Sequence, residues 1–255
     1  MVRYKSDINL DLTLSCGQCF RWKKIDEKWF GVVKGVEVIV FRDGESLVFE
    51  NISDEEFGDI FYDYFDFGTD YENILKVLEI DKNVQNSVEK NGNLHILRQE
   101  FPETLVSFII SQCNNIPRIS KIVDTLCREF GENNAFPTMD RLAGLNVEDL
   151  SVLRAGYRAD YILDAAKKIT KGEISEDGLR KMSTVEARKS LMNINGVGRK
   201  VADCTLLYGL HRLDVFPVDR HIKRICDRLY PDGLPVCFED YGGLAQQYLF
   251  VEQRG

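Results

Sequence analysis

The sequence lacks the features that mark several large classes of protein. Only 6 of its 255 residues are proline and 19 are glycine, whereas 44% are apolar, so collagen-like, low-complexity and disordered chains are excluded. No apolar run approaches the roughly 20 residues that a membrane span needs, and the first residues show no secretory signal. We therefore expect a soluble, intracellular protein that binds no membrane.

The seven cysteines are odd in number and widely spaced, which does not fit a disulfide framework. They also lack the grouping that a four-cysteine zinc or iron–sulfur site requires, so we expect no metal centre. Cys16 and Cys19 do fit the C-x-x-C pattern of a thiol-disulfide oxidoreductase, which stands as an alternative function. That motif belongs between a strand and a helix of a βαβ unit, whereas here it precedes a series of antiparallel strands.

An excess of basic residues is also missing, since the formal net charge is −8. The acidic excess is confined to residues 1–100, with 12 basic and 20 acidic residues, while residues 101–255 carry 21 of each. Within the second part, residues 186–230 hold nine basic and five acidic residues, a net charge of +4. This local distribution is compatible with nucleic-acid binding, which the total charge alone would argue against.

The pattern of apolar residues predicts an α+β fold, with an N-terminal antiparallel β-sheet domain followed by an all-helical domain. Segments 29–33, 36–41 and 46–49 are rich in β-branched and aromatic residues and are separated by turn signals. From about residue 54 the apolar spacing becomes helical, with stripes in 119–126, 150–169, 185–194 and 201–210. We place the β domain with its flanking helices at residues 1–85 and the helical domain at residues 86–255.

The most informative motif is Asn193-Ile194-Asn195-Gly196-Val197-Gly198-Arg199-Lys200, between two amphipathic segments. Its two glycines allow a tight hairpin with positive φ angles, and the exposed N–H groups of the second helix form an anion site suited to phosphate. Lys200 lies in the first turn of that helix, where the positive helix end favours the neutral, nucleophilic amine. Cys204, four residues on, shares its face.

Asp219 stands directly before another periodic helix, at the N-cap position. A carboxylate fixed near a lysine is also a compact pair for amine catalysis at an electrophilic carbon.

These motifs resemble the helix-hairpin-helix DNA glycosylases, and specifically the 8-oxoguanine DNA glycosylase/AP lyases. The resemblance spans nearly the whole chain, and the hairpin lies at about 186–210. It includes Ser15-Cys16-Gly17-Gln18-Cys19-Phe20-Arg21-Trp22, Leu97-Arg98-Gln99, Asn114-Asn115-Ile116-Pro117-Arg118, Gly156-Tyr157-Arg158-Ala159 and Gln246-Gln247-Tyr248-Leu249-Phe250. The hairpin alone is shared with non-enzymatic modules, whereas hairpin, lysine and the aspartate nineteen residues later form a much more specific combination.

The resemblance implies a base-excision repair enzyme that flips 8-oxoguanine out of duplex DNA, because the glycosidic bond is unreachable inside the stack. Lys200 matches the nucleophile whose amine attacks C1′ of the sugar, expels the base and forms a Schiff base, after which β-elimination nicks the strand. Asp219 matches the catalytic aspartate, which stabilises positive charge developing on the sugar. Gly17 matches the residue whose backbone carbonyl accepts the N7–H that guanine lacks.

The remaining matches surround the base and the rest of the DNA. Cys204 and Phe250 match the residues on the two faces of the base, and Gln246 the side chain that reads its Watson–Crick edge. The matches that fill the vacated stack and contact the orphaned cytosine are Asn115, Arg118, Tyr157 and Arg158. The matches that hold DNA phosphate are Gly196, Val197, Gly198 and His221. Where the family usually has three consecutive asparagines, this chain has Cys113-Asn114-Asn115.

The resemblance also implies partners and cofactors. Duplex DNA containing oxidised guanine is the expected partner, the chain is expected to act as a monomer, and no cofactor is required. A monovalent cation on the hairpin carbonyls is the one ion that the resemblance suggests. The location would be the cytoplasm, in association with the nucleoid, in a prokaryote and the nucleus in a eukaryote. The alternative from another class is a non-catalytic helix-hairpin-helix module that binds damaged DNA.

Overall fold

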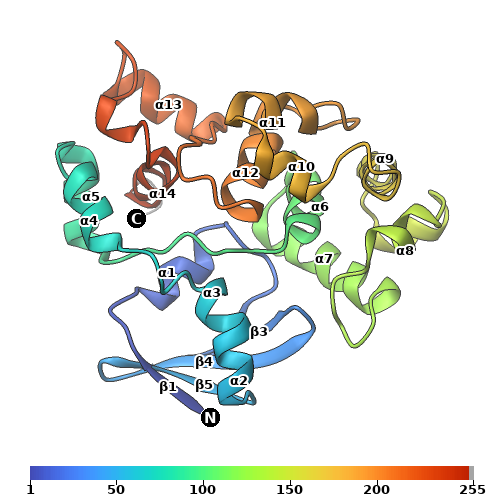
Figure 1. The fold of residues 1–255 in the computed structure, drawn as a ribbon, viewed down its shortest axis with the longest axis horizontal. Helices are drawn as coiled ribbons and strands as arrows, with labels where there is room; N and C mark the ends of the chain where they lie inside the picture. The colour runs from blue at the N-terminus through green and yellow to red at the C-terminus, as the bar shows by residue number, and fades with distance from the viewer. Residues whose placement is uncertain (253–255) are drawn as a thin grey trace.

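The computed structural model describes residues 1–252 and confirms the predicted α+β architecture. Figure 1 shows an antiparallel sheet with short helices beside it, and a larger helical part on the other side of an extended segment at 92–100. No helix within residues 1–252 is long and apolar enough to span a membrane. The division of the chain near residue 85 stays a prediction.

The sheet has five strands in the order β1-β5-β4-β3-β2. The three predicted strands are confirmed as β3 (Lys28–Val33), β4 (Val36–Asp43) and β5 (Ser46–Glu50). Two short edge strands are added, β1 (Val2–Lys5) and β2 (Lys23–Ile25). Alternate residues of β3 are buried, as expected for a sheet with one face on a core.

The core of the β domain lies between this sheet and a short helical segment. The segment consists of α2 (Asp54–Glu56), the π-helix η1 (Phe57–Phe61) and α3 (Tyr62–Tyr64), and begins at a Ser53–Glu56 capping box. The rings of Phe49 and Phe65 pack edge to face at 5.6 Å. A further helix, α1 (Leu10–Ser15), precedes the loop that carries Gly17.

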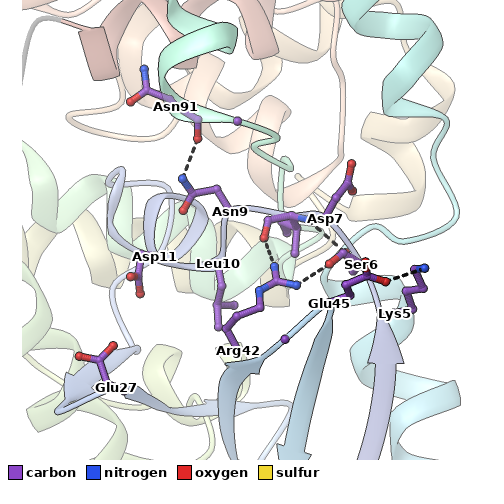
Figure 2. Close-up of a pocket in the computed structure, with 13 residues that line it drawn as sticks. Lys5, Ser6, Asp7, Asn9, Leu10, Asp11, Glu27, Arg42, Glu45 and Asn91 are labelled. Atoms are coloured by element: carbon purple, nitrogen blue, oxygen red, sulfur yellow. Dashed lines mark hydrogen bonds and ion pairs between the residues drawn. The ribbon is translucent and has the colours of Figure 1, made fainter.

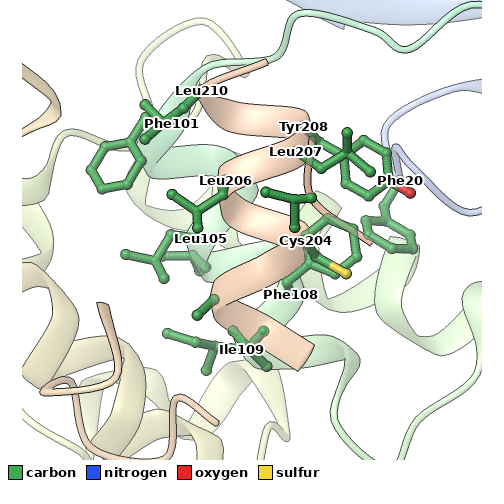
Figure 3. Close-up of a cluster of buried hydrophobic side chains, with 14 of the residues drawn as sticks. Phe20, Phe101, Leu105, Phe108, Ile109, Cys204, Leu206, Leu207, Tyr208 and Leu210 are labelled. Carbon is green, nitrogen blue, oxygen red and sulfur yellow. The ribbon is translucent and has the colours of Figure 1, made fainter. Parts of the chain in front are cut away.

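The helical part contains the remaining helices. They are α4 (Tyr71–Leu78), α5 (Lys82–Asn91), α6 (Phe101–Ser111), α7 (Ile116–Phe130), α8 (Met139–Ala143), η2 (Asp149–Leu153), α9 (Arg158–Thr170), α10 (Glu176–Lys181), α11 (Thr184–Leu191), α12 (Arg199–Gly209), α13 (Arg220–Leu229), η3 (Val236–Phe238) and α14 (Gly242–Glu252). At its centre α12 packs against α6. Figure 3 shows apolar side chains around α12, so this helix is held on several sides at once.

Two local predictions differ from the structure. The apolar stripe at 150–169 is not one helix, because Arg154 and Gly156 adopt φ angles of 51° and 61° and separate η2 from α9. Of the two hairpin glycines, only Gly196 has a positive φ, at 74°. Gly198 has φ −92° and is the N-cap of α12, so it does not adopt a left-handed backbone conformation. As a glycine it leaves the start of the helix without a side chain.

Candidate active site

A cavity of about 340 Å³ lies where the loop after α1 meets the helical part. Its wall combines that loop, the α6–α7 junction, α12, the segment before α13, and α14. Eight of the predicted site residues line it: Gly17, Asn115, Lys200, Cys204, Asp219, His221, Gln246 and Phe250. The volume is in the range of small-molecule binding sites. Residues from both ends of the chain therefore meet in one concave site.

Lys200 is the second residue of α12, and its amine is held at the cavity wall. Nζ donates to Ser111 Oγ at 3.3 Å and lies 4.7 Å from the centre of the Phe108 ring. The Ser111 hydroxyl donates its own proton to the Phe108 carbonyl at 2.8 Å, so its oxygen is left to accept from the amine. These contacts fix the position of the one amine in this lining.

Cys204 lies one turn further along the same face of α12, as its spacing from Lys200 predicts. Figure 3 shows its sulfur on the side of α12 that also carries Tyr208 and faces Phe20. Burial raises the pKa of the Cys204 thiol to about 11, although the nearby Lys200 charge acts to lower it. The thiol is therefore neutral at physiological pH and forms a small apolar wall.

Asp219 is the N-cap of α13, which confirms the predicted position. Its Oδ1 accepts from the backbone N–H groups of His221 and Ile222, both at 2.8 Å. Among the described residues no hydrogen bond involves Oδ2, so one carboxylate oxygen serves the helix and the other is available to the cavity. His221, in the first turn of α13, is exposed at the cavity rim.

Gly17 lies in the loop after α1 with φ at 90°, a conformation that L side chains rarely adopt. The loop is anchored by the fully buried Gln18 next to it. The Gln18 amide donates to the carbonyls of Thr13 and His95 and accepts from the N–H of Leu97, each at 2.9 Å. Buried side-chain hydrogen bonds of this kind fix the backbone that carries the Gly17 carbonyl.

Gln246 and Phe250 extend from α14 into the same lining, one turn apart. Gln246 is buried and accepts a hydrogen bond from Gln247 at 3.0 Å, whereas Phe250 is half-buried. In the same lining the ring of Phe108 stacks on Tyr208 at 5.4 Å.

Three predicted residues that concern the opposite base lie outside this lining. Arg118 and Tyr157 are exposed, and Arg118 donates to the carbonyl of Arg154 at 3.2 Å. Arg158 is buried and donates to the carbonyls of Gln112, Cys113 and Ala155.

These carbonyl contacts limit what Arg158 can offer to DNA. Four of the five guanidinium N–H donors are engaged in this way, which leaves one for another partner. Asn115, which does line the cavity, caps α7 by accepting from the Arg118 N–H at 3.0 Å.

The predicted phosphate-binding hairpin lies between α11 and α12, also outside the cavity lining. A Cβ added to Gly196 would lie 2.1 Å from the Tyr161 ring, so only glycine fits there. The hairpin is also tied to α9 by Asp164, which accepts from the N–H of Asn195 at 2.7 Å. The N-cap residue Gly198 has no side chain to accept from the first N–H groups of α12, so these groups are available to an anion.

Several residues of the site were not predicted from the sequence. These are Phe108, Ser111, Tyr208 and Gln247 in the lining, and Gln18 behind it. Their roles depend on contacts between distant segments. Gln247 alone had a local signal, because a second amide stands beside Gln246 in an otherwise apolar helix.

A larger cavity, of about 1090 Å³, lies between the sheet and α5. Figure 2 shows that its two labelled cations have partners: Arg42 donates to the carbonyls of Ser6 and Ile8, and Lys5 pairs with Glu45 at 2.8 Å. None of the predicted site residues lines it. The cavity therefore has no link to the predicted chemistry.

The C-x-x-C pair does not have the properties of a redox site. Cys16 and Cys19 are both buried, and the thiol of Cys19 donates to the carbonyl of Leu14. Burial also raises the pKa of Cys19 well above its usual range, the opposite of what a reactive thiol needs.

Comparison with known proteins agrees with this geometry. Residues 1–105 match the family described as "8-oxoguanine DNA glycosylase, N-terminal domain", and residues 106–233 match "HhH-GPD superfamily base excision DNA repair protein". The chain belongs to the 8-oxoguanine glycosylase family of the HhH-GPD superfamily. The first match covers the sheet and Gly17, and the second covers the hairpin, Lys200 and Asp219, while α14 lies beyond both.

Individual members of this family resemble the chain over most of its length. The "N-glycosylase/DNA lyase" of Saccharomyces cerevisiae is 32% identical, over 89% of this chain and 69% of its own. A structure described as "MBOgg1 in complex with low affinity DNA ligand" is 42% identical with a TM-score of 0.93, covering 99% of this chain and 94% of that one.

A structure of the Clostridium acetobutylicum 8-oxoguanine glycosylase/lyase "in complex with dsDNA containing cytosine opposite to 8-oxoG" is 34% identical, with a TM-score of 0.89. It covers 97% of this chain and 92% of that one.

Proposed function

We propose that this chain excises 8-oxoguanine from duplex DNA and then nicks the abasic strand, as a bifunctional DNA glycosylase/AP lyase. The observation that carries the proposal is the shared cavity, in which the Lys200 amine, the Asp219 carboxylate and the Gly17 backbone lie together. A non-catalytic DNA-binding module would need only the hairpin, and a redox role is opposed by the buried cysteines.

In the proposed reaction the neutral amine of Lys200 attacks C1′ of the everted nucleotide. The C1′–N9 bond breaks, and the base leaves with the bonding electrons and takes up one of the two amine protons. The C1′–O4′ bond of the sugar then breaks, the nitrogen forms a C=N bond to C1′, and O4′ takes up the second proton, which gives the Schiff base. β-Elimination then removes a proton from C2′ and breaks the bond between C3′ and the phosphate oxygen. Asp219 stabilises the positive charge that develops on the sugar.

Selection of the oxidised base rests on Gly17, whose backbone carbonyl accepts the N7–H and repels the bare N7 of guanine. Phe250 and Cys204 cover the two faces of the base, and Gln246 reads its Watson–Crick edge. The residues that fill the vacated stack and contact the orphaned cytosine are Asn115, Arg118, Tyr157 and Arg158. These roles are supported by the cavity, whose lining includes Gly17, Asn115, Cys204, Gln246 and Phe250.

Gly196, Val197, Gly198 and His221 hold DNA phosphate in this proposal, supported by the uncapped start of α12. HhH-GPD glycosylases generally need no cofactor, and residues 1–252 contain no group of His, Cys, Asp and Glu suited to a metal ion. The family resemblance suggests a monovalent cation on the hairpin carbonyls, and we propose a monomer that acts in the cytoplasm beside the nucleoid in a prokaryote or in the nucleus of a eukaryote.

Borohydride trapping tests the enzyme directly. The wild-type chain should form a covalent adduct with an 8-oxoguanine·cytosine duplex, and Lys200→Gln should form none while still binding the DNA. Lys76→Gln is the matched control, because Lys76 is an exposed lysine on α4 outside the cavity, paired with Glu72. An adduct that persists in Lys200→Gln, or none with the wild type, would exclude the proposed nucleophile.

A further inference from the structure

Gln247 is a buried amide in the wall of the proposed base pocket. Its side chain lines the cavity beside that of Gln246, although only 3% of the residue is exposed. The Nε2 group donates to the hydroxyl oxygen of Tyr208 and, at 3.0 Å, to Oε1 of Gln246. The Oε1 atom is buried and accepts no hydrogen bond from residues 1–252.

The hydrogen bonds of the Gln247 amide favour one orientation of its two ends. Its NH₂ group lies between two oxygens, so turning the amide over would place Oε1 against Oε1 of Gln246. Buried acceptors are usually paired, and leaving one unpaired is unfavourable. The structure therefore holds an unpaired, desolvated acceptor in a side chain that lines the wall where a flipped base would lie.

The Watson–Crick edge of 8-oxoguanine has the complementary groups. It carries one acceptor, O6, followed by two donors, N1–H and the exocyclic 2-amino group. Two adjacent glutamines supply two carbonyl acceptors for these two donors, and Oε1 of Gln246 keeps a second lone pair after accepting from Gln247.

We propose that Gln247 is a specificity-determining residue, whose Oε1 accepts a hydrogen bond from the 2-amino group of the everted base. This inference rests on the proposed function. It predicts a preference for oxidised purines that carry a 2-amino group, because a site built to bind a donor disfavours an analogue without it.

The test compares 8-oxoguanine with 8-oxohypoxanthine, which lacks only the 2-amino group, each opposite cytosine. Single-turnover excision rates are measured for both bases, and their ratio is compared between wild type and Gln247→Met, which keeps the side-chain volume. We expect Gln247→Met to reduce the preference for 8-oxoguanine by about tenfold, the scale of one hydrogen bond. The ratio within one variant is independent of its active fraction, and the weaker pairing of 8-oxohypoxanthine with cytosine affects all variants equally.

Ser87→Ala is the matched control, since Ser87 donates to the carbonyl of Tyr248 on the same helix but does not line the cavity. It should leave the ratio unchanged. If Gln247→Met does not fold, Gln247→Leu takes its place. An unchanged ratio in the folded Gln247 variant would overturn the inference, whereas failure of the wild type to excise 8-oxoguanine would overturn the proposed function instead.

Discussion

Asp219 serves both the fold and the proposed chemistry, and a single substitution separates the two roles. Oδ1 caps α13 through two hydrogen bonds of 2.8 Å, while the charge of the carboxylate would act on the sugar. Asparagine is about as good an N-cap as aspartate, so Asp219→Asn keeps the cap and removes the charge. Its stability loss is limited to the charge–helix interaction, about 0.3–1 kcal/mol.

The effect of Asp219→Asn on catalysis should be much larger. Removing one preorganised electrostatic contact from an active site slows the chemical step by about 100- to 1000-fold, or about 3–4 kcal/mol. Asp219→Ala should be equally slow, and should also lose the cap at a cost of about 1 kcal/mol. Single-turnover excision from an 8-oxoguanine·cytosine duplex measures the first quantity, and urea unfolding measures the second.

The matched control is Asp70→Asn. Asp70 caps α4 by accepting from the N–H of Asn73 at 3.1 Å and does not line the active-site cavity, so the same substitution there should leave excision unchanged. The reasoning would be refuted if Asp219→Asn excised the base within about threefold of the wild-type rate, a difference below 1 kcal/mol in the barrier. It would also fail if Asp219→Asn were as unstable as Asp219→Ala, because the cap would then depend on the charge.

Three further outcomes follow from the contacts. Gly196→Ala should lower the free energy of unfolding by about 2–4 kcal/mol in urea titrations, because its Cβ would overlap the Tyr161 ring at a positive φ; an unchanged midpoint would contradict the observed packing. Burial raises the pKa of Glu103 to about 7 from 4.5. The folded state therefore binds more protons than the unfolded state, and the free energy of unfolding should fall by about 1–3 kcal/mol as the pH rises from 4.5 to 7. Glu103→Gln should remove this contribution to the pH dependence of stability, and an unchanged pH dependence in the variant would refute the assignment. Ser111→Ala should slow single-turnover excision about 3- to 10-fold with unchanged DNA affinity, and Ser111→Thr should recover the rate, because Ser111 positions Lys200; equal rates would exclude that role.

The elements predicted correctly are those with strong local patterns. Strands β3, β4 and β5 and helix α7 were predicted because their apolar spacing is regular and their ends carry turn or cap residues. Strands β1 and β2 were missed because they are short edge strands, and β2 (Lys23–Ile25) is exposed at every residue. Edge strands of this kind owe their conformation to pairing with a neighbour rather than to their own sequence.

The site was predictable to the extent that its residues belong to recognisable motifs. Lys200 and Asp219 were chosen from their helix positions and from the family resemblance, and the structure places both in one cavity. The position of Ser111 depends on which helices pack together, and no local pattern contains that information. Gln247 has a local signal in the adjacent amides, but its contact with Tyr208 depends on the packing of α14 next to α12. For Arg158 the motif match predicted a contact with DNA, but it gave no sign that the guanidinium donates to backbone carbonyls within the protein.

The contacts of α9 show why residues outside the cavity can still act with it. The ring of Tyr161 covers Gly196 in the hairpin, and Asp164, three residues further along the helix, accepts from the N–H of Asn195. At the first turn of the same helix, Arg158 holds the carbonyls that follow α6, next to the segment that carries Asn115. Helix α9 thus contacts both the proposed phosphate-binding hairpin and the segment of the proposed opposite-base contacts.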